Sequence, residues 1–162
     1  IFFKFLLIFF LYNILISNVF LGDTGSYFLG FLISTISLFF YNQNIISAGF
    51  FACILSYPCL EIIFSISRRL RLKQNPFKPD NKHLHNLIFI YLKNLFPTLK
   101  YTNSLTGLLV NILFVLPSLL FYFYSKQLIN IYYWYIFMIH ILIYIIIYSF
   151  TLSKNNEHIV SK

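Results

Sequence analysis

Long apolar runs, separated by short polar segments, are the feature that most constrains what this chain can fold into. Hydrophobic residues make up 59% of the 162 residues and charged residues only 10%, whereas soluble domains are about half apolar and a quarter charged. A helix needs roughly 20 predominantly apolar residues to cross the hydrocarbon core of a bilayer. The pattern therefore predicts an all-α, polytopic membrane bundle and excludes an ordinary soluble domain.

The apolar runs predict about four full spans and the end of a fifth. The first run, from Ile1 to about Leu11, is too short to cross a bilayer and indicates the tail of a helix that starts upstream. The chain is thus expected to be the C-terminal part of a longer multi-pass domain. The full spans are expected at residues 27–46, 48–66, 105–124 and 131–152, with a hydrophilic loop at about 67–103.

The positive charge is concentrated in that loop, where eight of the 12 Lys and Arg residues lie between Arg68 and Lys100. Loops rich in Lys and Arg stay on the cytoplasmic side of a membrane, so this distribution favours a membrane over nucleic acid as the partner of the positive charge. Two predicted spans separate the loop from residues 22–26. Both segments are therefore expected on the same, cytoplasmic face.

Residues 22–26 form an acidic island, Gly22-Asp23-Thr24-Gly25-Ser26, at the mouth of the first full span. Asp23 is the only acidic residue among the first sixty, and a charge at this depth costs a few kcal/mol unless it is solvated or paired. Thr24 and Ser26 can cap a helix beginning near Tyr27, whose N-terminal N–H groups favour a phosphate. A simple helix cap and a ligand site both remain open. A lone carboxylate is a poor magnesium site, so a metal here needs a further acid.

The basic loop contains both cations and histidines. Arg68, Arg69 and Arg71 can bind a diphosphate through their guanidinium groups, or they can anchor the span to anionic lipid. Asp80 is placed to cap a new helix that lies in the membrane interface. Its expected apolar face has helical spacing and consists of Leu84, Leu87, Ile88, Tyr91, Leu92, Leu95 and Phe96.

His83 and His85 stand two residues apart near the predicted start of that helix. Both rings can face one ligand only if this turn is not regular helix. The pair is too small to hold zinc alone. By contrast, His140 lies inside the last predicted span and is expected to be a packed residue between helices.

Three segments, taken in order, resemble the polyprenyl-phosphate N-acetylhexosamine-1-phosphate transferases, a membrane family that starts bacterial envelope glycan synthesis. The first segment is similar to the family's Phe-Leu-Gly-Asp-x-Gly-Ser stretch. The second combines a Tyr-Pro pair, an acid and paired arginines, and the third matches a Pro-Phe-x-Pro-Asp-x-x-His-x-His-His signature. In this chain they are Phe20–Ser26, Tyr57-Pro58 with Glu61 and Arg68-Arg69, and Pro76–Asn86.

The resemblance implies transfer of a sugar-1-phosphate, most simply GlcNAc-1-phosphate, from a UDP-sugar to undecaprenyl phosphate, with Mg²⁺ and release of UMP. It implies a bacterial inner-membrane enzyme with a cytoplasmic active face, acting in cell-wall or lipopolysaccharide synthesis; whether it forms a homodimer is left open. Asp23 would be a catalytic or metal-binding carboxylate. His83 and His85 would be catalytic residues at the diphosphate, and substrate contacts would come from Arg68, Arg69, Asn86, Gly22 and Ser26.

The sequence departs from the family pattern at two positions: Asn86 replaces the third histidine, and Glu61 stands where Asp is usual. The family's upstream acidic pairs have no counterpart in residues 1–162, so this segment alone is expected to be inactive. Alternatives are a transferase acting on UDP-MurNAc-pentapeptide, an ion-coupled transporter that uses Asp23, and a degenerate membrane remnant.

Overall fold

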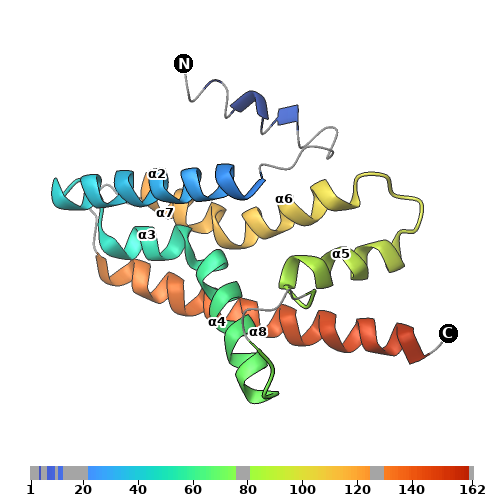
Figure 1. The fold of residues 1–162 in the computed structure, drawn as a ribbon. Helices are drawn as coiled ribbons and strands as arrows, with labels where there is room; N and C mark the ends of the chain where they lie inside the picture. Colours follow the sequence, from blue (N-terminus) through green and yellow to red (C-terminus); the bar gives the residue numbers. More distant parts are fainter. Residues whose placement is uncertain are drawn as a thin grey trace. The chain divides into compact units, whose positions relative to one another are not determined.

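The computed structural model describes residues 4, 7–9, 11–12, 22–75, 81–124 and 130–160; within these ranges the side chains of residues 23 and 156–160 are not described. Every regular element in the described ranges is a helix (Figure 1). This confirms the all-α membrane bundle predicted from the apolar runs. The described helices fall into two compact units, one within Ile1–Ile46 and the other within Ser47–Lys162.

The first unit contains helix α2, Gly22–Asn42. Its residues Thr24–Asn42 are long and apolar enough to cross a membrane. Ser34 and Thr35 donate their hydroxyl groups to carbonyl oxygens four residues earlier, at 2.8 and 2.9 Å, so that neither hydroxyl is an unpaired donor in an apolar run.

Helix α2 begins at Gly22, earlier than the start near Tyr27 that the sequence predicts. Gly22 has a φ of +71°, a left-handed conformation that glycine adopts without steric cost. The helix ends at Asn42 and is followed by Asn44 with a φ of 54°, a conformation that Asn tolerates better than most residues. Residues 43 and 44 form a turn that separates α2 from the next helix.

The second unit contains two helix pairs that are each bent at a short break. Helices α3, Ala48–Ile54, and α4, Ser56–Arg71, meet at 66°, and helices α6, Thr102–Phe114, and α7, Leu116–Tyr124, meet at 41°. The sequence predicts one continuous span for each pair. In both pairs a proline, Pro58 or Pro117, follows the break within three residues. Since a proline lacks an N–H group and its ring clashes with the carbonyl four residues earlier, it bends an apolar helix there.

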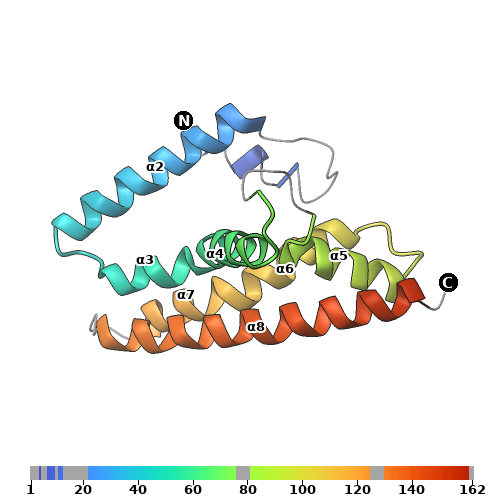
Figure 2. The same ribbon diagram turned by 60° about the horizontal axis from the view of Figure 1, so that its bottom comes forward.

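Helix α8, Asn130–Val160, runs along the second unit and contacts each of its other helices (Figure 2). Residues Asn130–Asn155 are the second stretch in the described residues that is long and apolar enough to cross a membrane. If each bent pair forms a single span, the number of candidate spans rises from two to four. The precise span boundaries stay a prediction. The buried core joins α4, α5, α6 and α8 and consists of Leu60, Leu84, Ile88, Leu92, Val110, Phe114 and Tyr144.

Helix α5, Leu84–Leu95, lies within the segment predicted as the basic loop and packs on α6 and α8 (Figure 2). Four residues of its expected apolar face are buried, Leu84, Leu87, Ile88 and Leu92, which confirms the helical period read from the sequence. The side chain of Asn155 in α8 donates to the Leu87 carbonyl at 3.0 Å. The N-cap is His83, whereas the sequence predicts a cap at Asp80, which lies outside the described residues.

An interior cluster of polar groups lies at the bend between α3 and α4. Buried Ser56 and His140 are joined by a 2.9 Å contact between the serine hydroxyl and Nδ1 of the imidazole. The thiol of Cys53 donates to the Tyr133 carbonyl at 2.8 Å. His140 is only 1% exposed, so its prediction as a packed residue between helices is confirmed.

Candidate functional site

The buried carboxylate of Glu61 connects α4 to the start of α5. Its Oε1 accepts a hydrogen bond from the backbone N–H of Leu84 at 2.6 Å, and its Oε2 lies 2.9 Å from Nδ1 of His83. The first N–H groups of a helix have no partner within the helix. His83 occupies the N-cap position without a capping hydrogen bond from its own side chain, so Glu61 supplies this acceptor from another helix.

The two histidine rings lie face to face at this helix start. His83 has an extended backbone, with φ −72° and ψ 148°, and so stands outside the regular helix that contains His85. The ring centroids are 5.6 Å apart and the ring planes differ by 7°. The condition set by the sequence is therefore met, because an irregular turn brings two histidines spaced two residues apart onto one side.

Tyr57 connects the second histidine to the same carboxylate. Its hydroxyl donates to Oε1 of Glu61 at 3.0 Å and lies 3.1 Å from Nδ1 of His85. The pKa of the His85 imidazole is lowered, mainly because burial disfavours its charged form; the charge of Glu61 opposes this shift and His83 adds to it. His85 is thus favoured in its neutral form. Tyr57, Glu61, His83 and His85 are called the histidine cluster below.

The paired arginines at the end of α4 have different surroundings. Arg69 is buried and donates to the Asn75 carbonyl at 3.3 Å. Arg68 donates to the Lys82 carbonyl at 3.1 Å and also to the hydroxyl of Tyr148 in α8. Its guanidinium carbon lies 5.8 Å from the centre of the Tyr148 ring, within the range of a cation–π contact. Arg68 therefore links α8 to the residue that precedes His83.

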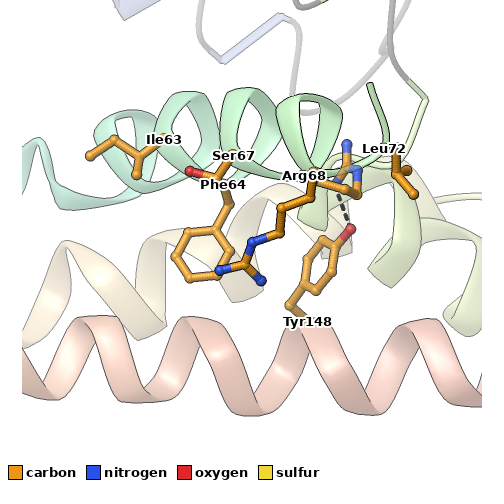
Figure 3. Close-up of a pocket in the computed structure, with 7 residues that line it drawn as sticks. Ile63, Phe64, Ser67, Arg68, Leu72 and Tyr148 are labelled. Atoms are coloured by element: carbon orange, nitrogen blue, oxygen red, sulfur yellow. Dashed lines mark hydrogen bonds between the residues drawn. The ribbon is translucent and has the colours of Figure 1, made fainter. Parts of the chain in front are cut away.

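A pocket of about 520 Å³ opens between α4 and α8 beside Arg68. Figure 3 shows Phe64 and Arg68 of α4 facing Tyr148 of α8 across this pocket. Apolar side chains form most of the wall and the arginines form its charged part. The seven lining residues are Ile63, Phe64, Ser67, Arg68, Arg71, Leu72 and Tyr148. Such a pocket suits an amphiphile with an apolar chain and an anionic group.

The remaining predicted site residues divide between the two units. Asn86 lies in the first turn of α5 and donates its amide to the Asn81 carbonyl at 3.4 Å. In the first unit, Ser26 donates to the Gly22 carbonyl at 2.9 Å within α2, and it does not cap a helix that starts near Tyr27. The side chain of Asp23 is outside the described ones. The shared surface of the acidic island and the histidines stays a prediction.

Sequence reasoning did not identify Tyr57, Glu61 and Tyr148 as parts of this site. Tyr57 and Glu61 entered it only as family motif residues. Their four-residue spacing places them on one face of α4, and Glu61 is the only acid in its apolar run. This was the available signal. The contact between Tyr148 and Arg68 joins residues 80 positions apart, which no local pattern indicates.

The described residues do not assemble a metal site by themselves. No group of three or more His, Cys, Asp and Glu side chains suited to a metal occurs in the described part of the chain. Both oxygens of Glu61 already accept hydrogen bonds or contact an imidazole nitrogen. A magnesium ion, which prefers oxygen ligands, would thus have to take its protein ligand from outside the histidine cluster.

Comparisons with known proteins identify curated relatives for part of the chain. An undecaprenyl-phosphate alpha-N-acetylglucosaminyl 1-phosphate transferase of Thermotoga maritima is 42% identical over 76 residues, which are 47% of this chain and 25% of that protein. A transferase of the same name from Escherichia coli K12 is 36% identical over 73 residues, 44% of this chain and 20% of that protein.

The matched segment thus spans a quarter or less of these relatives' length. No family model matches the chain. No solved structure matches it either. The names of these relatives nevertheless state the transferase activity that the three ordered motifs indicate. Over the matched segment, this chain is related to the undecaprenyl-phosphate N-acetylglucosaminyl 1-phosphate transferases, and the resemblance read from its motifs is confirmed.

Proposed function

We propose that the protein transfers GlcNAc-1-phosphate from UDP-GlcNAc to undecaprenyl phosphate and releases UMP. The observation that carries this proposal is the pair of parallel histidine rings held on Glu61, in a chain related to transferases of that name. Phosphoryl transfer needs little covalent chemistry from the protein, because positioning and electrostatic stabilisation provide most of the catalysis. The held imidazoles can position the nucleotide-sugar, and the neighbouring arginines can stabilise charge on the phosphate oxygens.

The lipid phosphate is proposed to use the pocket between α4 and α8. Its apolar wall suits part of a prenyl chain, and Arg68 and Arg71 suit the phosphate group. Arg68 also contacts the Lys82 carbonyl, next to His83 in the chain. The pocket and the histidine cluster are therefore adjacent, as the two substrates of a transfer between them require.

The other proposed roles follow the family resemblance. Asp23 is proposed as a catalytic or metal-binding carboxylate, with Gly22 and Ser26 beside it as substrate contacts. His83, His85, Arg69 and Asn86 are proposed to face the nucleotide-sugar. Since Arg69 is buried against Asn75, its proposed contribution is to hold the basic loop in place and to lend charge at short range.

Magnesium is proposed as the metal, held by Asp23 together with substrate phosphates. When bound, Mg²⁺ neutralises charge on the phosphate oxygens. The histidine cluster contributes orientation and hydrogen bonding independently of the ion. The localisation proposed is the bacterial inner membrane with the basic loop on the cytoplasmic side, where UDP-sugars are available. A homodimer stays an open expectation.

The test is exchange of labelled UMP into UDP-GlcNAc by the natural full-length protein in membranes that contain undecaprenyl phosphate. We expect exchange that depends on Mg²⁺ and disappears without the lipid phosphate. Exchange only with UDP-MurNAc-pentapeptide would assign the other branch of the family, and ion-coupled flux without exchange would favour a transporter. Residues 1–162 alone are expected to release no UMP, and release by this segment would contradict the role proposed for upstream acids.

A further inference from the structure

The hydrogen bonds of the histidine cluster all run toward one carboxylate. An ionised carboxylate has acceptor atoms only. Three donor groups meet Glu61: the Leu84 N–H at 2.6 Å, the Tyr57 hydroxyl at 3.0 Å and, at 2.9 Å, Nδ1 of His83. A short contact between Nδ1 and this acceptor requires a proton on Nδ1. The carboxylate therefore determines which nitrogen of His83 carries the hydrogen.

Tyr57 determines in a similar way which ring nitrogen of His85 carries the hydrogen. A tyrosine hydroxyl has a single proton, and in this structure it points to Oε1 of Glu61. The Tyr57 oxygen then remains as an acceptor, and the polar atom 3.1 Å away is Nδ1 of His85. Since two acceptors do not form a hydrogen bond, Nδ1 of His85 also carries a proton. Glu61 thus determines the tautomer of His83 directly, and it determines the tautomer of His85 through Tyr57.

We propose that Glu61 is a positioning residue that holds both neutral histidines in the Nδ1–H tautomer, with their two Nε2 lone pairs available as a matched pair of acceptors. Neither Nε2 has a hydrogen-bond partner among the described residues. The parallel rings, 5.6 Å apart, keep the two nitrogens in a fixed relation. Two imidazolium ions at this distance would repel one another, whereas two neutral rings do not.

The inference rests on the proposed function where it concerns the ligand. Two Nε2 acceptors suit hydroxyl or N–H donors, which a nucleotide-sugar carries on its sugar and base. Phosphate oxygens need donors, and arginine guanidinium groups meet that need. The lowered pKa of His85, caused chiefly by burial, agrees with a neutral His85 ring. The two histidines accordingly accept hydrogen bonds from hydroxyl or N–H groups of the ligand.

The test uses the full-length protein in nanodiscs with ¹⁵N-labelled histidine rings at pH 8. Ring ¹⁵N chemical shifts separate a protonated nitrogen from one with a free lone pair. His83→Asn and His85→Asn assign the two signals among those of the protein's histidines. We expect both cluster histidines as Nδ1–H tautomers. A dominant Nε2–H tautomer or imidazolium in either one overturns the proposal.

Three variants separate positioning from packing. Glu61→Gln replaces one acceptor oxygen by an NH₂ donor. Because the Leu84 N–H and the Tyr57 hydroxyl both need the remaining oxygen, the NH₂ group faces Nδ1 of His83, so His83 is expected to shift to the Nε2–H tautomer while His85 stays unchanged. Tyr57→Phe removes only the route to His85, and His83 should stay unchanged. Asn155→Ala is the matched control, because it removes a tether of α5 at Leu87 without touching either ring. If both rings change tautomer in Tyr57→Phe or in Asn155→Ala, the proposed hydrogen-bond path is contradicted.

A kinetic arm addresses the consequence for transfer. In the UMP exchange assay we expect Glu61→Gln to lower kcat by about 10 to 100-fold, by analogy with the loss of the hydrogen-bond partners that orient metal-binding histidines. Asn155→Ala should change kcat little. If the wild-type protein shows no exchange, the proposed function fails while the NMR result still decides the tautomers. An unchanged kcat in Glu61→Gln would remove the positioning role.

Discussion

The histidine cluster and the interior cluster both include residues of α4 but satisfy their polar groups differently. In the histidine cluster a carboxylate accepts from a backbone N–H and a tyrosine and contacts an imidazole. Among the described residues, the interior cluster has no charged member, and the Tyr133 hydroxyl and Nε2 of His140 have no hydrogen-bond partner there. Charge is therefore kept at the end of the bundle, while neutral groups occupy the bend between α3 and α4.

The difference teaches which histidines of this chain can act on a ligand. His140 is buried and bonded to Ser56, so that a ligand cannot reach it without opening the helices. His83 keeps about a third of its side chain exposed while Nδ1 is fixed by Glu61. A functional histidine needs both properties, a held ring and an accessible nitrogen.

Replacing Glu61 by Ala should have the largest effect. The change leaves the Leu84 N–H, the Tyr57 hydroxyl and Nδ1 of His83 without their acceptor. Leaving buried donors unsatisfied costs about 1–3 kcal/mol each, and partial exposure of the cluster reduces the sum to about 3 kcal/mol. Denaturant unfolding in detergent measures the loss. Ile62→Ala, an exposed neighbour on α4, is the control and should cost well under half as much.

Replacing His140 by Leu should destabilise the protein by about 1–3 kcal/mol, because the fully buried hydroxyl of Ser56 loses its partner. The double variant Ser56→Ala/His140→Leu should recover most of this loss, since both polar groups are then gone. Transfer activity per folded molecule should be unchanged in both variants. A double variant that is less stable than the single one would contradict a purely structural interior cluster.

Lowering the pH should destabilise the wild-type protein through His85. Its folded pKa is below the unfolded value, so the unfolded chain binds more protons in the window between the two, and stability falls as the pH drops through that window. Below the folded pKa this contribution no longer changes. Unfolding measured from pH 8 downward, in the wild type and in His85→Asn, isolates the effect as their difference. A wild-type stability that rises relative to that of His85→Asn as the pH falls would have the opposite sign to this expectation.

Replacing Arg71 by Ala should change stability least, by about 0.5 kcal/mol or less, because its side chain is exposed. The same change should raise KM for undecaprenyl phosphate about tenfold, the loss of roughly one charge-assisted hydrogen bond. Lys73→Gln removes an exposed positive charge that does not line the pocket and should leave KM nearly unchanged. Equal effects of both variants would indicate general surface charge and not a lipid pocket.

The sequence predicts the helices well because their signals are local. Helix α5 follows from the spacing of Leu84, Leu87, Ile88 and Leu92. The bends were not predicted, because the runs stay apolar through Leu55 and Val115. Pro58 and Pro117 were the available signals, and Pro58 was interpreted only as part of a motif.

The candidate site was predicted as a set of residues but not as a network. His83, His85 and the arginines stand out because polar residues are rare in this chain. The role of Glu61 depends on a contact across 23 positions, which neither helical period nor local propensity determines. The N-cap of α5 was missed for the same reason, since its acceptor comes from α4 and not from the preceding residues.

The contact between Glu61 and Leu84 also closes a loop of the chain. The entropy lost on closing a flexible loop grows only with the logarithm of its length, so that doubling the length costs about 0.6 kcal/mol more. Related chains can therefore lengthen or shorten the segment after α4 at little thermodynamic cost. The contact itself is constrained, because the Glu61 carboxylate accepts from the first amide of α5. That contact determines where a loop of any length must end.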